Sequence, residues 1–293
     1  MLQKGNKERK QASGTSLVFG GWLGASLGGY VLLIVLLILA DVFFIMHEVQ
    51  DDAGKAQIMN VVTSEHFMSS IKLSFVSCTV SAILSMFVAV PIGYTLSRYA
   101  FRGRALIDAI LDIPVVLPPL VIGLSLLILF NKFPAEGDFW GLKSLEAVFN
   151  SMGIQVTNTK LAVVVAQFTV AAAFASRMMK STFDQIDTRT ENVAMTLGAS
   201  RGQAFFDIIL PQAYRGMLAA GTLAWARSLG EFGPILVFAG LTRGKTEVLS
   251  TSIYLEINTG NIQGAVVISL LMIILALMTI FMVRFLSEKG LEK

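Results

Sequence analysis

The sequence predicts an all-α membrane protein: a polytopic bundle of six transmembrane helices with both chain termini in the cytoplasm. Composition is the first indication, because 54% of the 293 residues are hydrophobic and only 15% are charged. A typical soluble domain carries about 25% charged residues, so this apolar excess favours burial in lipid. The other two indications are six long apolar runs and an uneven distribution of lysine and arginine along the chain.

Each apolar run is long enough to cross a bilayer, since about 20 helical residues span roughly 30 Å of hydrocarbon. The runs are continuous and do not alternate between apolar and polar residues, which favours helices over a membrane β-barrel. They cover approximately Leu17 to Met46, Met68 to Leu96, Ala105 to Phe130, Leu161 to Met179, Gly216 to Phe238 and Gly264 to Leu286. We therefore divide the chain into a basic cytoplasmic tail at 1–16, a first anchor helix at 17–46, an external loop at 47–67, a core of five helices at 68–286 and a cytoplasmic tail at 287–293.

The first run follows a short tail that contains four basic residues and resembles the start of a secretory signal. It is about twice as long as a signal core and no small-residue cleavage site ends it, so we interpret it as an uncleaved anchor. With this tail inside, fifteen lysines and arginines fall in the inner segments and six in the outer ones. Because short cytoplasmic loops are enriched in these residues, the count predicts that both termini are cytoplasmic. The net charge of +3 reflects this topology and does not indicate nucleic-acid binding.

The third run contains Pro114, Pro118 and Pro119. A proline inside a helix removes a backbone hydrogen bond and bends the helix, and broken helices at mid-membrane mark transport sites. A simple packing kink is the alternative. Asp108 and Asp112 lie where this run enters from the cytoplasm, and the positive end of the helix dipole, together with nearby arginines, accounts for them.

A polar cytoplasmic segment at 181–215, between the fourth and fifth runs, is long enough to hold structure of its own. Thr188 with Glu191, and Ser200 with Gln203, have the spacing of capping boxes. In such a box the hydroxyl accepts a free backbone N–H and the later side chain reaches back to the cap residue. The segment is therefore predicted to form two short helices.

Gly198 is expected to separate these two helices and Pro211 to end the second one. Both helices carry apolar residues although they should face water, namely Val193, Ala194, Leu197, Phe205, Phe206, Ile209 and Leu210. Such an apolar surface needs a partner. Four partners fit it: the protein's own bundle, the lipid interface, a second copy of the chain, or a groove on another protein.

The fifth run contains Arg227 and Glu231, which are four residues apart and so share one face of a helix. Ionisable side chains inside a membrane are costly and usually face an aqueous path or a partner. Either the two neutralise each other within the helix, or Arg227 attracts a dianion that Glu231 positions.

The sequence contains no set of side chains suited to catalysis or metal binding. Cys78 is the single cysteine, and His47 and His66 have no partners at ligand spacing. Residues 240–246 approach the pattern of a phosphate-binding loop, but three residues separate the glycines where four are required. We therefore expect no enzymatic activity, no metal site and no cofactor bound by this chain.

The cytoplasmic segment resembles the loop motif of ABC importer permeases, E-A-A, three residues, G, nine residues, I, one residue, L-P. The corresponding residues here are Asn192-Val193-Ala194, Gly198, Ile208 and Leu210-Pro211. Asn192 and Val193 depart from the family's usual Glu and Ala, and Glu191 stands one place earlier. In that family the loop is a coupling helix that docks on an ATPase subunit. The resemblance thus implies an ATPase-docking set of Glu191, Asn192, Val193, Ala194, Leu197, Gly198, Ala199, Ile208, Leu210 and Pro211.

Other segments resemble the molybdate and sulfate permeases of the same family. They are Pro91-Ile92-Gly93, Asp112 to Pro119, Arg227 to Gly233, Phe238-Ala239-Gly240, Lys245-Thr246 and Ile253-Tyr254. This resemblance implies import of an oxyanion, either molybdate, tungstate or sulfate, by alternating access. The expected translocation pathway then includes Pro114, Pro118, Pro119, Arg227, Ser228 and Glu231.

The resemblance also implies an assembly in the inner (cytoplasmic) membrane of a bacterium. It comprises a second permease chain, as a homodimer or heterodimer, two ATPase subunits that hold ATP and Mg, and an external binding protein that delivers the oxyanion. An importer of another solute, such as phosphate, thiosulfate or an amino acid, stays open because the loop motif identifies the architecture and not the cargo. An ion-gradient carrier fits less well, since the sequence shows no paired repeat. The choice among oxyanions is expected to lie in the binding protein.

Overall fold

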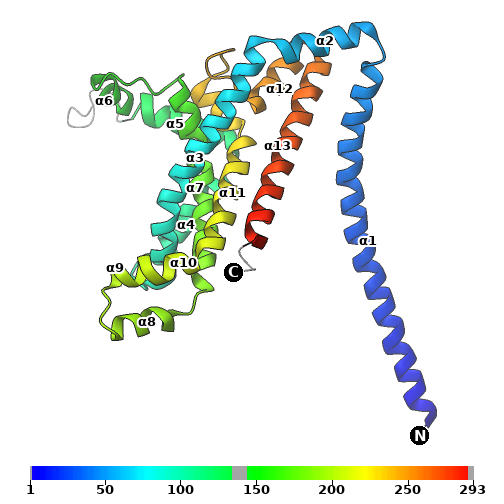
Figure 1. Cartoon of the computed structure of the whole chain (residues 1–293), viewed down its shortest axis with the longest axis vertical. Helices are drawn as coiled ribbons and strands as arrows, with labels where there is room; N and C mark the ends of the chain where they lie inside the picture. The colour runs from blue at the N-terminus through cyan, green and yellow to red at the C-terminus, as the bar shows by residue number, and fades with distance from the viewer. Residues whose placement is uncertain (1, 134–143, 290–293) are drawn as a thin grey trace. The chain divides into compact units, whose positions relative to one another are not determined.

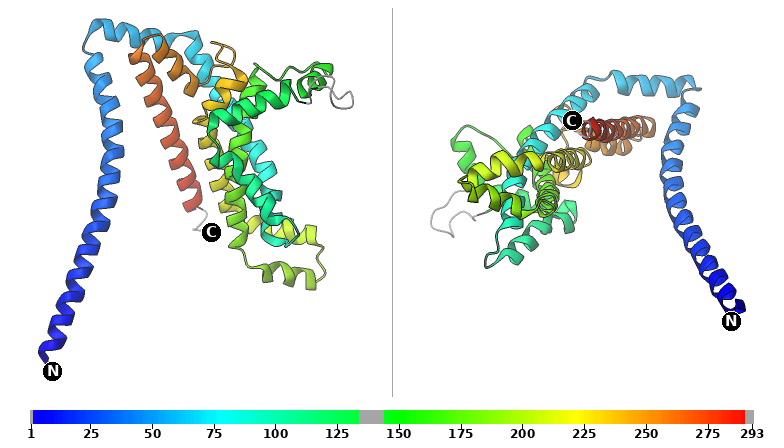
Figure 2. Two further views of the ribbon diagram at one scale, coloured as in Figure 1. Left: turned by 180° about the vertical axis from the view of Figure 1, so that it is seen from behind. Right: turned by 60° about the horizontal axis from the view of Figure 1, so that its bottom comes forward.

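A computed structural model describes residues 2–133 and 144–289 of the chain (Figures 1 and 2). Every regular element in these ranges is a helix, which confirms the predicted all-α class. The chain divides into two compact units, residues 1–56 and residues 57–293. Two basic residues of the charge count, Lys143 and Lys293, lie outside the described residues.

The first unit consists of helix α1, Leu2–Glu48, and the beginning of helix α2, Asp52–Thr63. The part of α1 at Phe19–Glu48 is long and apolar enough to cross a membrane, and the unit buries none of its most apolar stretch. This part includes nearly all of the predicted anchor at 17–46. The helix begins at Leu2, so the predicted tail at 1–16 continues the anchor as one helix.

The second unit is built around three helices that run side by side: α3, Glu65–Arg98, α7, Lys160–Asp184, and α11, Tyr214–Leu229 (Figure 1). Small side chains line the interfaces between these helices. The buried face of α3 repeats every three or four residues as Ser70, Ser74, Ser77, Cys78, Ser81, Ala82, Ser85, Ala89 and Gly93. Facing positions on α7 and α11 include Ala162, Ala166, Ala171, Ala175, Ala220 and Ala224. Small residues let helix backbones approach closely, as is usual for helices that pack in lipid.

The third apolar run forms two helices, α4, Arg104–Val116, and α5, Pro119–Asn131, which are bent by 111° relative to each other. The break falls at Leu117 and Pro118, both of which have extended backbone. A residue before a proline disfavours the helical region, and here two prolines follow in succession. Pro114 lies inside α4 without ending it. The prolines therefore produce a much larger break than a simple kink.

The fifth apolar run is also broken, so the prediction of one continuous helix at 216–238 is wrong. Helix α11 ends at Leu229, and a π-helical turn, η2, follows at Ile235–Ala239. A Cβ at Gly233 would lie 2.8 Å from Pro119 Cβ, so α5 approaches the chain here too closely for any side chain. The break thus allows the start of α5 to pack against the turn that follows α11.

The remaining helices are α6, Leu145–Ser151, α12, Leu249–Asn258, and α13, Ile262–Lys289. Within the described residues four helices are long and apolar enough to cross a membrane, and the bent α4–α5 pair makes a fifth if it is one span. The four are Phe19–Glu48 of α1, α3, α7 and Ile262–Phe281 of α13.

Candidate functional site

Segment 181–215 folds into helix α8, Thr188–Thr196, and a second helical run that starts with α9, Arg201–Gln203. The predicted capping box of Ser200 and Gln203 is confirmed, because both of its hydrogen bonds are present. The predicted box of Thr188 and Glu191 is wrong, since Asp187 is the N-cap of α8. Its carboxylate accepts a backbone N–H two residues on, which an aspartate does as well as a threonine.

Gly198 separates the two helices as predicted, with a φ of +98° that favours glycine. Pro211 does not end the second helix, contrary to the prediction. The run continues from α9 through a π-helical turn, η1, Ala204–Ile209, into α10, Leu210–Gln212. In η1 the N–H of Leu210 donates to the carbonyl of Phe205, five residues back. This wider turn offers room for the proline ring, which would clash with a carbonyl four residues back in an α-helix.

Glu191 of α8 faces the bundle. The Tyr94 hydroxyl donates to Glu191 Oε1 at 2.6 Å, and Arg98 Nε lies 3.4 Å from Oε2 in an ion pair that is almost fully buried. Arg98 also donates to the carbonyl of Ile186 at 2.9 Å. These contacts fix α8 to the end of α3, so the Glu191 carboxylate serves the bundle and is not exposed.

The apolar residues of the segment divide into an inner and an outer set. Ala194 and Ile209 are buried, and the Phe205 ring lies 4.6 Å from that of Tyr94. The outer set is Val193, Leu197 and Phe206, which are exposed, Leu197 to 84%. The bundle therefore leaves exposed three of the seven apolar residues predicted to form this surface. Of the other candidate docking residues, those exposed are Asn192, Gly198 and Pro211, and those partly buried are Ala199, Ile208 and Leu210.

A second candidate site lies where α11 ends. Arg227 Nη1 is 2.8 Å from Glu231 Oε2, which shows that the predicted pair does form. The Arg227 guanidinium also lies over the ring of Phe174 at 5.5 Å, a cation–π contact. Glu231 is 1% exposed, and its backbone carbonyl accepts a hydrogen bond from Ser250 at 2.7 Å.

These residues border a cavity of about 280 Å³. The break between α4 and α5 and the turn after α11 form its wall, namely Pro118, Pro119, Leu120, Arg227, Gly230, Glu231, Phe232 and Gly233. Two predicted pathway residues do not border it. Pro114 lies within α4, and Ser228 is buried toward α7, where Gln167 donates to its carbonyl at 3.2 Å.

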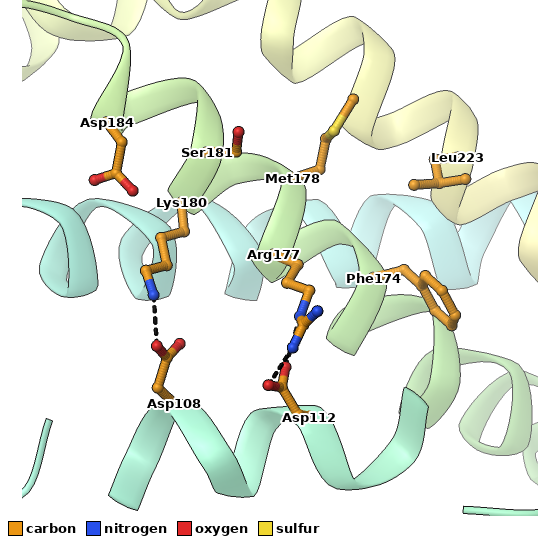
Figure 3. A pocket seen from close by; sticks show the side chains of 9 residues that line it. All are labelled: Asp108, Asp112, Phe174, Arg177, Met178, Lys180, Ser181, Asp184 and Leu223. Atoms are coloured by element: carbon orange, nitrogen blue, oxygen red, sulfur yellow. Dashed lines mark hydrogen bonds and ion pairs between the residues drawn. The ribbon is translucent and has the colours of Figure 1, made fainter. Parts of the chain in front are cut away.

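A larger cavity of about 500 Å³ lies between α4, α7 and α11 (Figure 3). Two ion pairs cross it: Lys180 with Asp108 at 2.5 Å, and Arg177, whose Nε donates to Asp112 at 2.6 Å. Both aspartates were expected to be explained by helix-end charge, and their partners on α7 were not predicted. The matched spacing of acids four apart and bases three apart is a signal only once the two helices are known to be neighbours.

Residues 240–246 form a turn that the hydrogen bonds of Thr246 hold together. Thr246 is buried, and its hydroxyl donates to the Gly240 carbonyl at 3.0 Å and accepts the Thr242 N–H at 3.1 Å. The hydroxyl that would hold a metal ion in a phosphate-binding loop is therefore used inside the turn.

Two solved structures share the fold of this chain. One is the bacterial alginate ABC transporter in complex with an alginate pentasaccharide-bound periplasmic protein, with a TM-score of 0.64 and 18% identity over 91% of this chain and 95% of that one. The other is the MetNI methionine ABC transporter in an inward-facing conformation, with a TM-score of 0.57 and 17% identity over 82% and 98%. The chain therefore has a fold found in ABC transporter structures.

Residues 83–289 match the family described as binding-protein-dependent transport system inner membrane component, and the chain belongs to this family. Relatives include the sulfate transport system permease protein CysT of Salmonella typhimurium, 29% identical over 90% of this chain and 92% of that protein. A putative molybdenum transport system permease protein of Bacillus subtilis is 33% identical over 70% and 87%. A probable molybdenum ABC transporter permease protein of Haloferax volcanii is 32% identical over 97% of both chains.

Proposed function

We propose that this chain is the permease subunit of an ABC importer that carries a tetrahedral oxyanion, either sulfate, molybdate or tungstate. The observation that carries this proposal is similarity along nearly the whole chain to permeases named for molybdenum and for sulfate. The cargoes in those names share one chemistry, a compact doubly charged anion, so one pathway suits both. The protein belongs, on this proposal, in the inner membrane of a bacterium.

The proposed topology has six membrane crossings with both termini in the cytoplasm. The excess of lysine and arginine in the inner segments supports this orientation. The bent pair α4–α5 counts as the third crossing, and α11 with the turn and η2 as the fifth. Segment 181–215 is then cytoplasmic and the loop at 47–67 external.

The proposed partner on the cytoplasmic side is an ATPase subunit that covers the outer apolar set of Val193, Leu197 and Phe206. Exposed apolar residues on a helical segment are typical of helix-in-groove docking. ATP and Mg belong to that partner, and this chain is a transporter subunit without enzymatic activity. The complete assembly contains two such ATPase subunits, a second permease chain and an external binding protein.

The proposed pathway passes Arg227 at the cavity bordered by Pro118 and Pro119. An arginine stays charged at any physiological pH and presents several N–H donors to an oxyanion. A charged residue in the interior of a membrane protein is costly, which favours a functional reason for its presence.

Docking is tested by co-purification of a tagged chain with the ATPase, comparing wild type with Gly198→Asp. The variant puts a charged side chain at a left-handed backbone position beside the outer apolar set. Gly260→Asp is the matched control, because Gly260 also has positive φ and open space around it but lies before α13, far along the chain. We expect only Gly198→Asp to lose the ATPase. Loss in neither variant, or in both, contradicts the docking proposal.

Transport is tested with the assembled importer in proteoliposomes that contain its binding protein. ATP-dependent uptake of labelled sulfate or molybdate supports the substrate class. Uptake of neither anion, with phosphate or an amino acid carried instead, overturns it.

A further inference from the structure

We propose that Glu231 competes with the transported anion for Arg227. The Glu231 carboxylate pairs with Arg227 when the pathway is empty, and an oxyanion binds Arg227 only by displacing this carboxylate. This inference rests on the proposed function and differs from both roles that the sequence left open for Glu231, neutralising Arg227 or positioning the anion. The consequence is a permease site that binds its cargo weakly and releases it readily.

The first observation is that the Glu231 carboxylate has a single partner. Both of its oxygens are buried, and neither accepts a hydrogen bond from any donor in the described residues. Its charged partner among the described residues is Arg227, whose Nη1 lies 2.8 Å from Oε2. Buried carboxylates normally accept several hydrogen bonds, because an unsatisfied charged group is costly.

Other buried glutamates in this protein follow that rule. Glu247 accepts hydrogen bonds from the Ser252 hydroxyl at 2.9 Å and from the Gly244 N–H at 3.4 Å. Glu191 accepts one from Tyr94 in addition to its ion pair with Arg98. Glu231 lacks such anchors, so it is held only by the cation that the anion would use.

The second observation concerns Arg227, which is the only cation among the described residues that border the smaller cavity. Its side chain is 29% exposed, whereas that of Glu231 is 1% exposed. The cavity thus gives access to the arginine, while the glutamate is sheltered. An incoming dianion meets the guanidinium first and competes for it with twice the charge of the carboxylate.

The same arrangement recurs at the larger cavity. Its two cations, Arg177 and Lys180, are each paired with an aspartate of α4 (Figure 3). Phe174 borders this cavity and also contacts Arg227, so its ring links the larger cavity to the arginine of the smaller one. In the part of the chain that the structure describes, every cation that borders either cavity is therefore already paired with a carboxylate. A path with unpaired cations would hold a dianion, whereas paired cations let it pass.

The test measures equilibrium binding of labelled sulfate and of molybdate to the purified permease–ATPase complex in nanodiscs, without the binding protein. Glu231→Gln keeps the shape of the side chain and removes its charge. When a binding site is free for only a fraction of the time, its apparent affinity is reduced by that fraction. If the Arg227–Glu231 pair is open about a tenth of the time, removing the charge of Glu231 should therefore tighten binding about tenfold. Glu247→Gln is the matched control, a buried glutamate that does not border the anion cavity, and should leave affinity unchanged.

Two further variants keep the result interpretable. Arg227→Gln combined with Glu231→Gln should abolish the gain, because the gain requires the freed arginine. If Glu231→Gln does not assemble, Glu231→Asp shortens the carboxylate away from Arg227 and should give a smaller increase in affinity. Assembly of each complex is checked by size-exclusion chromatography.

Three outcomes overturn the proposal. Weaker binding by Glu231→Gln means that the carboxylate positions the anion, and unchanged binding means that the ion pair is only structural. If the wild-type importer neither binds nor transports sulfate or molybdate, the proposed function fails and this inference fails with it. If the wild type transports but Glu231→Gln does not bind more tightly, the inference alone fails.

Discussion

Replacing Gly93 by alanine tests whether α3 and α7 are held at contact distance by their small residues. A Cβ at Gly93 would lie 2.7 Å from both the backbone nitrogen of Lys180 and the Cβ of Met179. Ordinary contact begins at 3.4 Å, so α7 would have to move by 3.4 − 2.7, about 0.7 Å. Overpacking costs about 1–3 kcal/mol. The cost should be near the upper end, about 3 kcal/mol, here, because the atoms that the new Cβ would meet include backbone, which moves only together with its helix. Alanine regains about 1 kcal/mol of helix propensity, which leaves a net loss of about 2 kcal/mol.

The assay is equilibrium unfolding of the purified chain in mixed micelles, followed by circular dichroism. Gly221→Ala on α11 is the matched control, because its Cβ would meet only the flexible side chain of Met86 at 3.6 Å. This control should be as stable as wild type or slightly more stable. Equal stability of Gly93→Ala and Gly221→Ala would refute the close approach of α3 and α7.

Three further predictions concern segment 181–215. Glu191→Ala leaves Arg98 buried without its counter-charge, so the segment should lose about 3 kcal/mol of stability and become sensitive to limited proteolysis. Ser200→Ala should cost about 1 kcal/mol in the same unfolding assay, whereas Thr188→Ala should cost almost nothing, because Thr188 is not the N-cap. Leu197→Ser should leave the unfolding free energy within about 0.5 kcal/mol of wild type, since the side chain is exposed, yet reduce ATPase retention. Full retention of the ATPase by the Leu197→Ser variant would show that the outer apolar set is not part of the docking surface.

Much of the fold follows from the sequence because a membrane span has strict requirements. About 20 apolar residues are needed to cross the hydrocarbon, and this fixes the cores of α3, α7 and α13. Local backbone chemistry is equally direct at Gly198, where only a left-handed residue can join the two helices, and at Ser200, whose capping box is confirmed. These features depend on neighbours within a few positions along the chain.

Several of the features that sequence reasoning missed depend on contacts between distant segments. The prolines at 118 and 119 predict a bend, but its angle of 111° goes with close packing of α5 against the turn at Gly233. The end of α11 lies within an apolar run, but Gly230, Gly233 and Pro234 follow it directly, and this local signal was passed over in the prediction of a single span. The ion pairs of Arg177 and Lys180 join residues that are distant in the chain. Arg177 lies 65 residues after Asp112, and Lys180 lies 72 residues after Asp108.

Helix α7 connects segment 181–215 with the residues that border both cavities. Near its end, the Phe183 ring lies 5.6 Å from that of Tyr94, in the aromatic cluster against which α8 and η1 pack. One turn earlier Lys180 pairs with Asp108, and further back Phe174 contacts Arg227. Nine residues of unbroken helix, about 14 Å, span these contacts. Because protein interiors are densely packed, a shift of α7 relative to α3 would move Phe174, Lys180 and Phe183 together. One unbroken helix therefore joins the aromatic cluster beside segment 181–215 to the ion pairs at both cavities.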